Sequence, residues 1–202
     1  TKTAENTFRD LQIAADVSRQ VTTVLDIEQL LQQVVALTAK NYGLYACSVY
    51  LPSEDGRELF QAAGADFVGQ PLDVPELRRI PYDADPSVIA LAARTRKPVT
   101  VNDVGESKEY LSLSALSQTR SELSIPMLLG NRVLGIFDLQ STSPDRFGEE
   151  DLRVLNSLAE QIAVAVRNAQ LFAQVEASRE AAEEASRVKS QFLANMSHEL
   201  RT

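Results

Sequence analysis

The sequence predicts an α+β fold, in which an antiparallel sheet is flanked by helices and followed by a long C-terminal helix. Three observations predict it. Apolar residues recur at three- and four-residue intervals over residues 6–38, which is typical of helices. Short apolar stretches separated by turn residues follow between Ala46 and Gln140, as in strands joined by hairpins. From Glu149 to Thr202 the chain contains neither glycine nor proline, and helix-favouring residues dominate.

The N-terminal helical pattern divides into two helices. We expect one helix over residues 1–20 and a second that begins near Asp26, whose side chain suits a helix start. A short helix is expected over Pro86–Arg94, and turn residues at Pro52–Gly56 and Gly130–Asn131 favour hairpin connections. The predicted strands are Ala46–Leu51, Glu58–Ala63, Pro98–Asn102, Leu123–Leu129 and Val133–Leu139.

The C-terminal helix carries a narrow apolar seam. Its residues alternate in steps of three and four, the spacing at which two helices pack together: Leu155, Leu158, Ile162, Ala165, Ala169 and Phe172. We therefore predict a parallel homodimer through the N- and C-terminal helices, or a docked partner helix. The seam is weak between Gln174 and Lys189, which fits either a solvated connector or a helix whose register can slip.

Composition and charge exclude several function classes. The 202 residues include 20 Lys+Arg and 28 Asp+Glu, a net charge of −8, which argues against binding nucleic acid. No apolar run is long enough for a membrane-spanning helix, so we expect a cytoplasmic segment, while an anchor upstream of Thr1 stays open. A lone Cys47 excludes a disulfide framework. A lone His198 excludes a catalytic triad, a His-rich metal site and a haem site within residues 1–197.

The last eleven residues place that histidine on the polar side of a helix. At about 100° per residue, the apolar arc of Phe192, Leu193, Met196 and Leu200 is centred at about 50°, whereas His198 falls at about 240°. An exposed imidazole, with an ordinary pKa of about 6.5, is largely neutral at physiological pH and can act as a nucleophile. Glu199 follows it and can take up its proton. An ordinary surface histidine is the alternative.

The run from Phe192 to Thr202, FLANMSHELRT, resembles the phosphoacceptor box of sensor histidine kinases at every position. The resemblance implies that His198 is phosphorylated from ATP and that Glu199 is the general base. It also implies a longer parent protein, because the family's second helix and ATP-binding domain do not occur in these 202 residues. ATP and Mg would serve that absent kinase domain, whereas no cofactor is expected in this segment. The implied partner is the receiver domain of a response regulator.

A second resemblance covers the middle of the chain. Residues Ser121–Ser141 resemble the closing strands of GAF domains, and Pro144–Leu152 continue the resemblance into the last helix. Pro98–Asp103 with Tyr110 fit the family's preceding strand and loop. The similarity spans about residues 25–172 and implies a sensor fold. It leaves the ligand unknown, because GAF domains bind cyclic nucleotides, tetrapyrroles, haem, small metabolites or nothing.

Residue types narrow the ligand classes. A bilin is normally tethered by a cysteine, but Cys47 lies in an early strand without a neighbouring histidine and fits a small apolar core residue better. Haem bound through a histidine is excluded, and no convincing match to the cyclic-nucleotide-binding pattern occurs. A small molecule or anion between the sheet and its covering helices is the default expectation.

The GAF resemblance places a ligand pocket among the central strands, the short helix and the loop before Asp103. The apolar candidates for its lining are Val49, Leu51, Phe60, Ile80, Val88, Leu91, Val101, Tyr110 and Ile136. The polar candidates are Ser87, Asp103 and Ser124. Filling the core is the alternative role of each apolar residue, and accepting hydrogen bonds from turn N–H groups is that of Asp103.

We therefore predict four segments: an N-terminal helix over residues 1–20, a GAF-like sensor over 21–172, a coiled-coil linker over 173–189 and the start of the phosphoacceptor helix over 190–202. Together they favour the sensory and phosphoacceptor segment of a dimeric two-component sensor histidine kinase. A ligand or partner would shift the GAF domain, and the shared helix would carry the change to His198. The alternative is a non-enzymatic GAF dimerisation or interaction module with a filled core. Regulation of a cyclase or phosphodiesterase is disfavoured by the His-Glu box.

Overall fold

The structure, a computed structural model, describes residues 27–112 and 114–199, with side chains described as far as Lys189. The helix predicted over residues 1–20 lies outside these residues. The strands are β1 (Ala46–Pro52), β2 (Glu58–Asp66), β3 (Arg79–Pro81), β4 (Val99–Val101), β5 (Ser121–Leu129) and β6 (Arg132–Ser141). The helices are α2 (Ile27–Tyr42), α3 (Val88–Thr95) and α4 (Glu149–Glu199), with 3-10 turns at Pro75–Leu77 and Ser114–Leu116.

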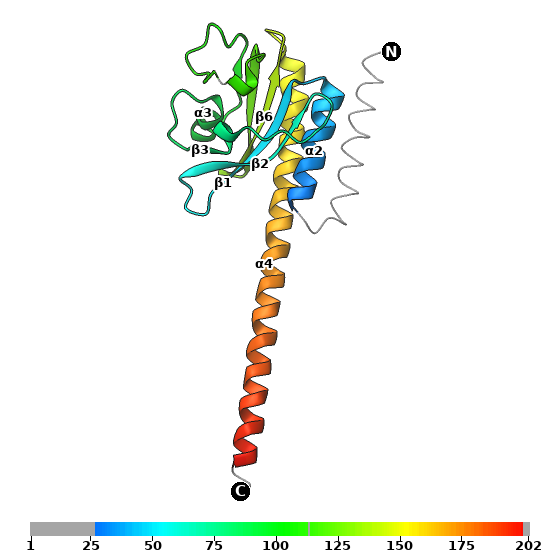
Figure 1. The fold of residues 1–202 in the computed structure, drawn as a ribbon, viewed down its shortest axis with the longest axis vertical. Helices are drawn as coiled ribbons and strands as arrows, with labels where there is room; N and C mark the ends of the chain where they lie inside the picture. The colour runs from blue at the N-terminus through cyan, green and yellow to red at the C-terminus, as the bar shows by residue number, and fades with distance from the viewer. Residues whose placement is uncertain (1–26, 113, 200–202) are drawn as a thin grey trace. The chain divides into compact units, whose positions relative to one another are not determined.

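The strands of the described residues form one antiparallel sheet in the order β3-β2-β1-β6-β5-β4 (Figure 1). The predicted α+β class and the predicted strands are confirmed, with small shifts at their ends. Strand β3 was not predicted, because its three residues include one buried side chain, Ile80, and are too few to show a period. The short helix begins at Val88 because the Ser87 hydroxyl caps it, accepting a hydrogen bond from the Ala90 N–H at 3.1 Å.

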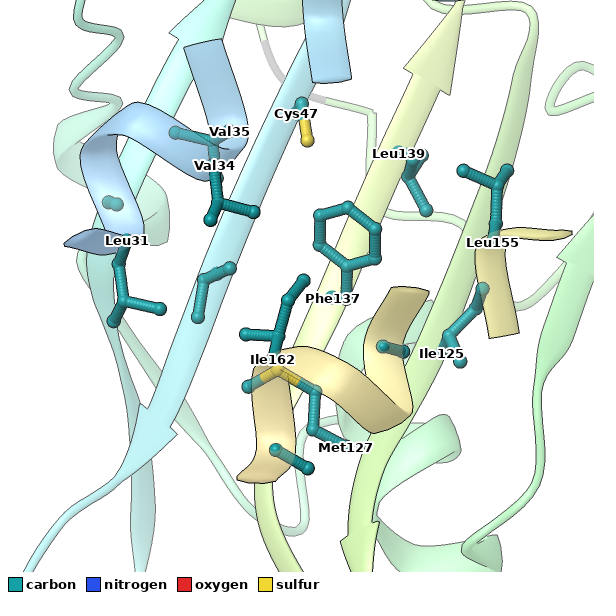
Figure 2. Close-up of a cluster of buried hydrophobic side chains, with 14 of the residues drawn as sticks. Leu31, Val34, Val35, Cys47, Ile125, Met127, Phe137, Leu139, Leu155 and Ile162 are labelled. Atoms are coloured by element: carbon teal, nitrogen blue, oxygen red, sulfur yellow. The ribbon is translucent and has the colours of Figure 1, made fainter. Parts of the chain in front are cut away.

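The main core lies between one face of the sheet and the helices α2 and α4. Side chains at alternate strand positions supply its floor, and Figure 2 shows them beneath the two helices. The labelled contributors are Leu31, Val34 and Val35 from α2, Cys47 from β1, Ile125 and Met127 from β5, Phe137 and Leu139 from β6, and Leu155 and Ile162 from α4. A smaller cluster on the opposite face packs α3 against the sheet through Ile89, Tyr50 and Ile136.

Part of the predicted helix seam is used inside the domain. Leu155, Ile162 and Ala165 are 1%, 2% and 7% exposed, because they pack into the main core. The same seam leaves Phe172 51% exposed. Intramolecular packing therefore accounts for the seam up to Ala165, and an apolar surface that a partner helix could cover begins after it.

The chain divides into two compact units, Thr1–Val166 and Arg167–Thr202. The second unit contains the C-terminal part of α4, whose side chains are largely exposed as far as they are described. Arg179 pairs with Glu176 at 3.2 Å and with Glu183 at 2.8 Å, which supports the helix one turn away on each side. No helix among the described residues combines the length and hydropathy needed to cross a bilayer.

A matched pair of leucines tests the position of the core. Leu139 is 0% exposed and Leu129 is 42% exposed. Leu139→Ala should lower the free energy of unfolding by about 2–5 kcal/mol, because it leaves a cavity under α4, whereas Leu129→Ala should cost less than about 1 kcal/mol. Urea denaturation of both variants measures the difference. Equal losses would contradict the assignment of the core face.

Candidate functional site

A row of polar side chains lies on the sheet face opposite the main core. Phe137 belongs to that core, so the adjacent Asp138, and Gln140 two residues on, point to the other face. Their cross-strand partners on β5 are Ser124 and Glu122. Asp138 is 2% exposed and Glu122 is 4% exposed. Two carboxyl groups are therefore buried on neighbouring strands near the centre of the sheet.

Hydrogen bonds connect this row. The Ser124 hydroxyl donates to Asp138 Oδ1 at 2.6 Å, and Gln140 Nε2 donates to Asp138 Oδ2 at 3.1 Å. The Thr119 hydroxyl donates to Gln140 Oε1 at 2.7 Å. The carboxyl groups of Glu122 and Asp138 are also hydrogen-bonded to each other. Such a bond requires one of the two to hold a proton.

Burial raises the pKa of both carboxyl groups. For Glu122 the pKa is raised well above its ordinary value, first by burial and then by the negative charge of Asp138. For Asp138 burial also raises the pKa, while hydrogen bonds from Glu122, Ser124 and Gln140 act in the opposite direction. Because Asp138 also accepts hydrogen bonds from Ser124 and Gln140, its ionised form is the better stabilised of the two, and the shared proton belongs on Glu122. Among the described residues no lysine or arginine is buried, so no buried cation compensates the pair.

A cavity of about 100 Å³ adjoins the polar row. Glu122 and Gln140 contribute to its lining from the sheet. Three other elements supply the remaining walls. The start of α3 contributes Ser87, Val88 and Ile89, and strand β3 contributes Arg79, Ile80 and Pro81. The segment that follows β4 contributes Tyr110, Leu111 and Leu116. Arg79 is already paired with Glu58 at 3.0 Å. The cavity thus joins a mainly apolar wall to a buried acidic pair.

Four of the sequence-predicted residues line this cavity: Ile80, Ser87, Val88 and Tyr110. Ser87 has a structural task as well, because its hydroxyl caps α3. Tyr110 is half-buried, and its hydroxyl is hydrogen-bonded to Thr119. Burial is the main cause that raises the pKa of Tyr110, so it stays a neutral phenol that can donate or accept.

Val49, Leu51 and Phe60 lie on the other face of the sheet. Val49 and Leu51 belong to the core beneath α2 and α4, and Phe60 packs against that core. Because alternate residues of a strand point to opposite faces, these three side chains do not line the cavity. They fill the core, which was the alternative role for every apolar candidate.

The remaining pocket candidates on β4, β5, β6 and α3 do not line the cavity. Ser124 is fully buried and committed to Asp138, and Ile136 packs in the cluster beneath α3. Val101 is buried in β4, and Leu91 is half-buried on α3. Neither belongs to the lining of the cavity.

Asp103 accepts a hydrogen bond from a turn N–H group, which was the alternative role given to it from the sequence. Its Oδ2 accepts a hydrogen bond from Arg120 at 2.8 Å, and its Oδ1 accepts one from the Gly105 N–H at 3.0 Å. The Arg120 hydrogen bond, followed by the Gly105 one, lowers the pKa of Asp103. The side chain therefore ties the loop after β4 to the start of β5.

Sequence reasoning missed Glu122, Asp138 and Gln140. A signal was present, because polar residues stand at alternate positions in two strands that are otherwise apolar: Glu122 and Ser124 in β5, and Asp138 and Gln140 in β6. Polar residues with a period of two inside buried strands indicate a second, polar face of the sheet.

Cys47 lies apart from the cavity lining. Cys47 is in the main core on the opposite face, and burial, followed by the charge of Asp138, raises the pKa of its thiol. It is inert by these criteria. His198 and Glu199 are helical residues of α4, and their side chains lie outside the described ones, so their roles remain predictions.

The raised pKa values predict how stability depends on pH. Below the ordinary carboxyl pKa of about 4, Glu122 and Asp138 are protonated in both the folded and the unfolded chain. As the pH rises through the raised pKa values of the folded chain, the stability that the protonated pair contributes is lost. Glu122→Gln removes one titrating group and keeps a side chain that can donate to Asp138. In dialysed protein it should raise the free energy of unfolding at pH 8 by about 1–3 kcal/mol, with a smaller gain at pH 5.

Thermal melts across this pH range measure the effect. Glu106→Gln is the matched control, because it removes the same charge from an exposed side chain and should leave the pH profile unchanged. A lower melting temperature for Glu122→Gln at pH 8 would contradict the account of the buried pair.

Curated relatives of the chain include signalling and regulatory proteins. It is 30% identical over 126 residues to hybrid signal transduction histidine kinase G of Dictyostelium discoideum, which covers 57% of this chain and 4% of that protein. It is 26% identical over 165 residues to the DNA-binding transcriptional activator HyfR of Escherichia coli, covering 78% of this chain and 24% of that protein. The chain thus spans a quarter or less of the length of these two relatives.

Solved structures show the same fold. The GAF domain of a phosphoenolpyruvate-protein phosphotransferase from Coxiella burnetii superposes with a TM-score of 0.71 at 22% identity, covering 84% of this chain and 99% of that one. Free methionine-R-sulfoxide reductase from Neisseria meningitidis, determined with its substrate, superposes with a TM-score of 0.69 at 22% identity, covering 81% of this chain and 91% of that one.

The GAF domain family profile matches residues 24–167. The match covers the whole sheet, α2, α3 and the part of α4 that packs in the core. The chain therefore belongs to the GAF domain family.

Proposed function

We propose that this chain is the sensory and phosphoacceptor segment of a two-component sensor histidine kinase. The GAF domain binds a small molecule in the cavity beside Glu122, and α4 transmits the bound state to His198. Support comes from the cavity, from the FLANMSHELRT run and from the similarity to a histidine kinase. The segment needs an ATP-binding domain with ATP and Mg for phosphorylation, and a response regulator to receive the phosphoryl group.

One observation carries the proposal: a single helix contains both core residues of the GAF domain and the histidine of the box. α4 begins at Glu149, contributes Leu155 and Ile162 to the core, and is helical without a break through His198. A continuous hydrogen-bonded helix transmits rotation or translation better than a flexible linker does. A change in how the first turns pack therefore reaches the box.

The exposed apolar residues of the second unit suit a parallel dimer. Leu171, Phe172 and Val175 are 41%, 51% and 61% exposed. A second copy of the helix is the simplest cover for them, because homodimers are the commonest symmetric assemblies. In this proposal the dimer begins where the intramolecular seam ends.

The first test concerns phosphorylation. When residues 1–202 are fused to the second helix and ATP-binding domain of a sensor histidine kinase, ATP and Mg should label His198 with an acid-labile, base-stable phosphoryl group. His198→Ala should abolish the label, and Glu199→Gln should slow labelling by about a hundredfold or more if Glu199 is the base. Ser197→Ala is the control for labelling of the neighbouring hydroxyl. Full labelling of His198→Ala would refute the assignment.

The second test concerns ligand binding. Native mass spectrometry of freshly purified protein should show an added small mass that denaturation removes. Ala84→Leu should reduce it, because Ala84 lines the cavity and a larger side chain fills that space, whereas Ala177→Leu on the exposed part of α4 should not. Repeated absence of any added mass, with no stabilisation by metabolite mixtures, would favour a non-enzymatic module with a filled core.

A further inference from the structure

The cavity has unequal hydrogen-bonding capacity along its lining. The Gln140 amide is occupied on both sides, since its nitrogen donates to Asp138 and its oxygen accepts from Thr119. The Ser87 hydroxyl oxygen accepts from the Ala90 N–H as the cap of α3, and Arg79 is paired with Glu58. The carboxylate of Glu122, once ionised, has lone pairs in excess of its bond with Asp138. On the sheet side of the cavity, the free capacity is therefore that of the Glu122 acceptor, while the Ser87 O–H and the remaining Arg79 N–H groups are donors on the other walls.

Charge distinguishes a cationic ligand from a neutral donor. A buried pair of carboxyl groups without a nearby cation must either keep its protons or gain a positive partner. The titratable groups around the pair are the neutral phenols of Tyr50 and Tyr110 and the charged side chains of Glu76 and Arg79 at the cavity wall. The one cation among them, Arg79, is paired with Glu58. α3 presents uncharged residues to the cavity. Two carboxylates fall short of the six or more oxygen ligands that a hard divalent metal takes.

We propose that the cavity binds a small ligand through a protonated amine, whose ammonium group donates a hydrogen bond to Glu122 while its apolar part lies against Ile80 and Val88. The proposal rests on ligand sensing by the GAF domain and names the ligand class. Binding displaces the proton shared by the two carboxyl groups, which leaves to solvent as the ammonium takes its place. The exchange replaces one positive group by another, so both carboxyl groups are ionised beside the ammonium while the net charge of the site is unchanged.

Three probes of equal chain length test the class: butylammonium, butan-1-ol and butyrate, titrated into residues 1–202 and followed by backbone amide chemical shifts. Butylammonium should bind at least about tenfold more tightly than butan-1-ol, because its hydrogen bonds to carboxylates are charge-assisted, and butyrate should not bind. Its shifts should be largest at residues 122 and 138. The affinity should rise from pH 5 to pH 8 as the pair ionises, since an amine stays protonated up to about pH 10.

Variants locate the effect. Glu122→Gln should weaken butylammonium binding by about tenfold and leave butan-1-ol unchanged, while Glu106→Gln, which removes an exposed charge, should change neither. Equal affinities for butylammonium and butan-1-ol, an unchanged affinity in Glu122→Gln, or no binding of butylammonium at all would each overturn the ammonium assignment. The sensing role is judged separately, by the mass found on the native protein.

Discussion

Strand β6 lies between β1 and β5 and is buried over most of its length, so each of its residues has to suit one of two different environments. Phe137 and Leu139 enter the core beneath α2 and α4, whereas Asp138 and Gln140 enter the polar row on the other face. A slip of one residue would place a carboxyl group beneath the helices and a phenyl ring among the polar groups. The register of the sheet and the chemistry of the cavity are therefore determined together.

The cost of burying the polar row is reduced because most of its members form hydrogen bonds with one another. Asp138 accepts from Ser124 and Gln140, and Gln140 accepts in turn from Thr119. The exceptions are the carboxyl pair, which shares a proton, and the Tyr50 hydroxyl, which has no partner. A domain with a large apolar core on one face of its sheet can bear this cost, and unsatisfied polar groups in native proteins concentrate at functional sites.

The strands and the main helices could be predicted from periodicity, because each covers enough residues to show a pattern. Strand β3 could not, since three residues do not establish a period. Val49, Leu51 and Phe60 were assigned to the pocket because an apolar side chain does not reveal which face of a sheet it occupies. The shift in register between Val49 and Tyr50 makes the faces of β1 and β2 harder still to assign from alternation.

The same limit applies to α4. Steps of three and four residues describe any helix with one apolar face, whether a second helix or a sheet covers it. For Leu155 and Ile162 the cover is the chain's own sheet. The His-Glu box, by contrast, is recognised from residue types alone, and its roles depend on chemistry that fold and packing do not specify. The cavity needed the structure, because its walls come from β3, α3 and a loop that are far apart in sequence.

In the proposed mechanism a ligand signal has to cross β5 and β6 to reach α4, because the part of α4 in the core and the cavity lie on opposite faces of the sheet. Neighbouring residues make this crossing short: Asp138 stands in the polar row, and the next residue in each direction, Phe137 or Leu139, belongs to the core that contains Leu155 and Ile162. A rigid peptide unit joins each pair, so a displacement of Asp138 moves its neighbours with it. Closely packed interiors transmit such shifts to the elements that they contact. A ligand that changes the ionisation of the acidic pair also supplies what a switch requires, a difference in free energy between two states of the same domain.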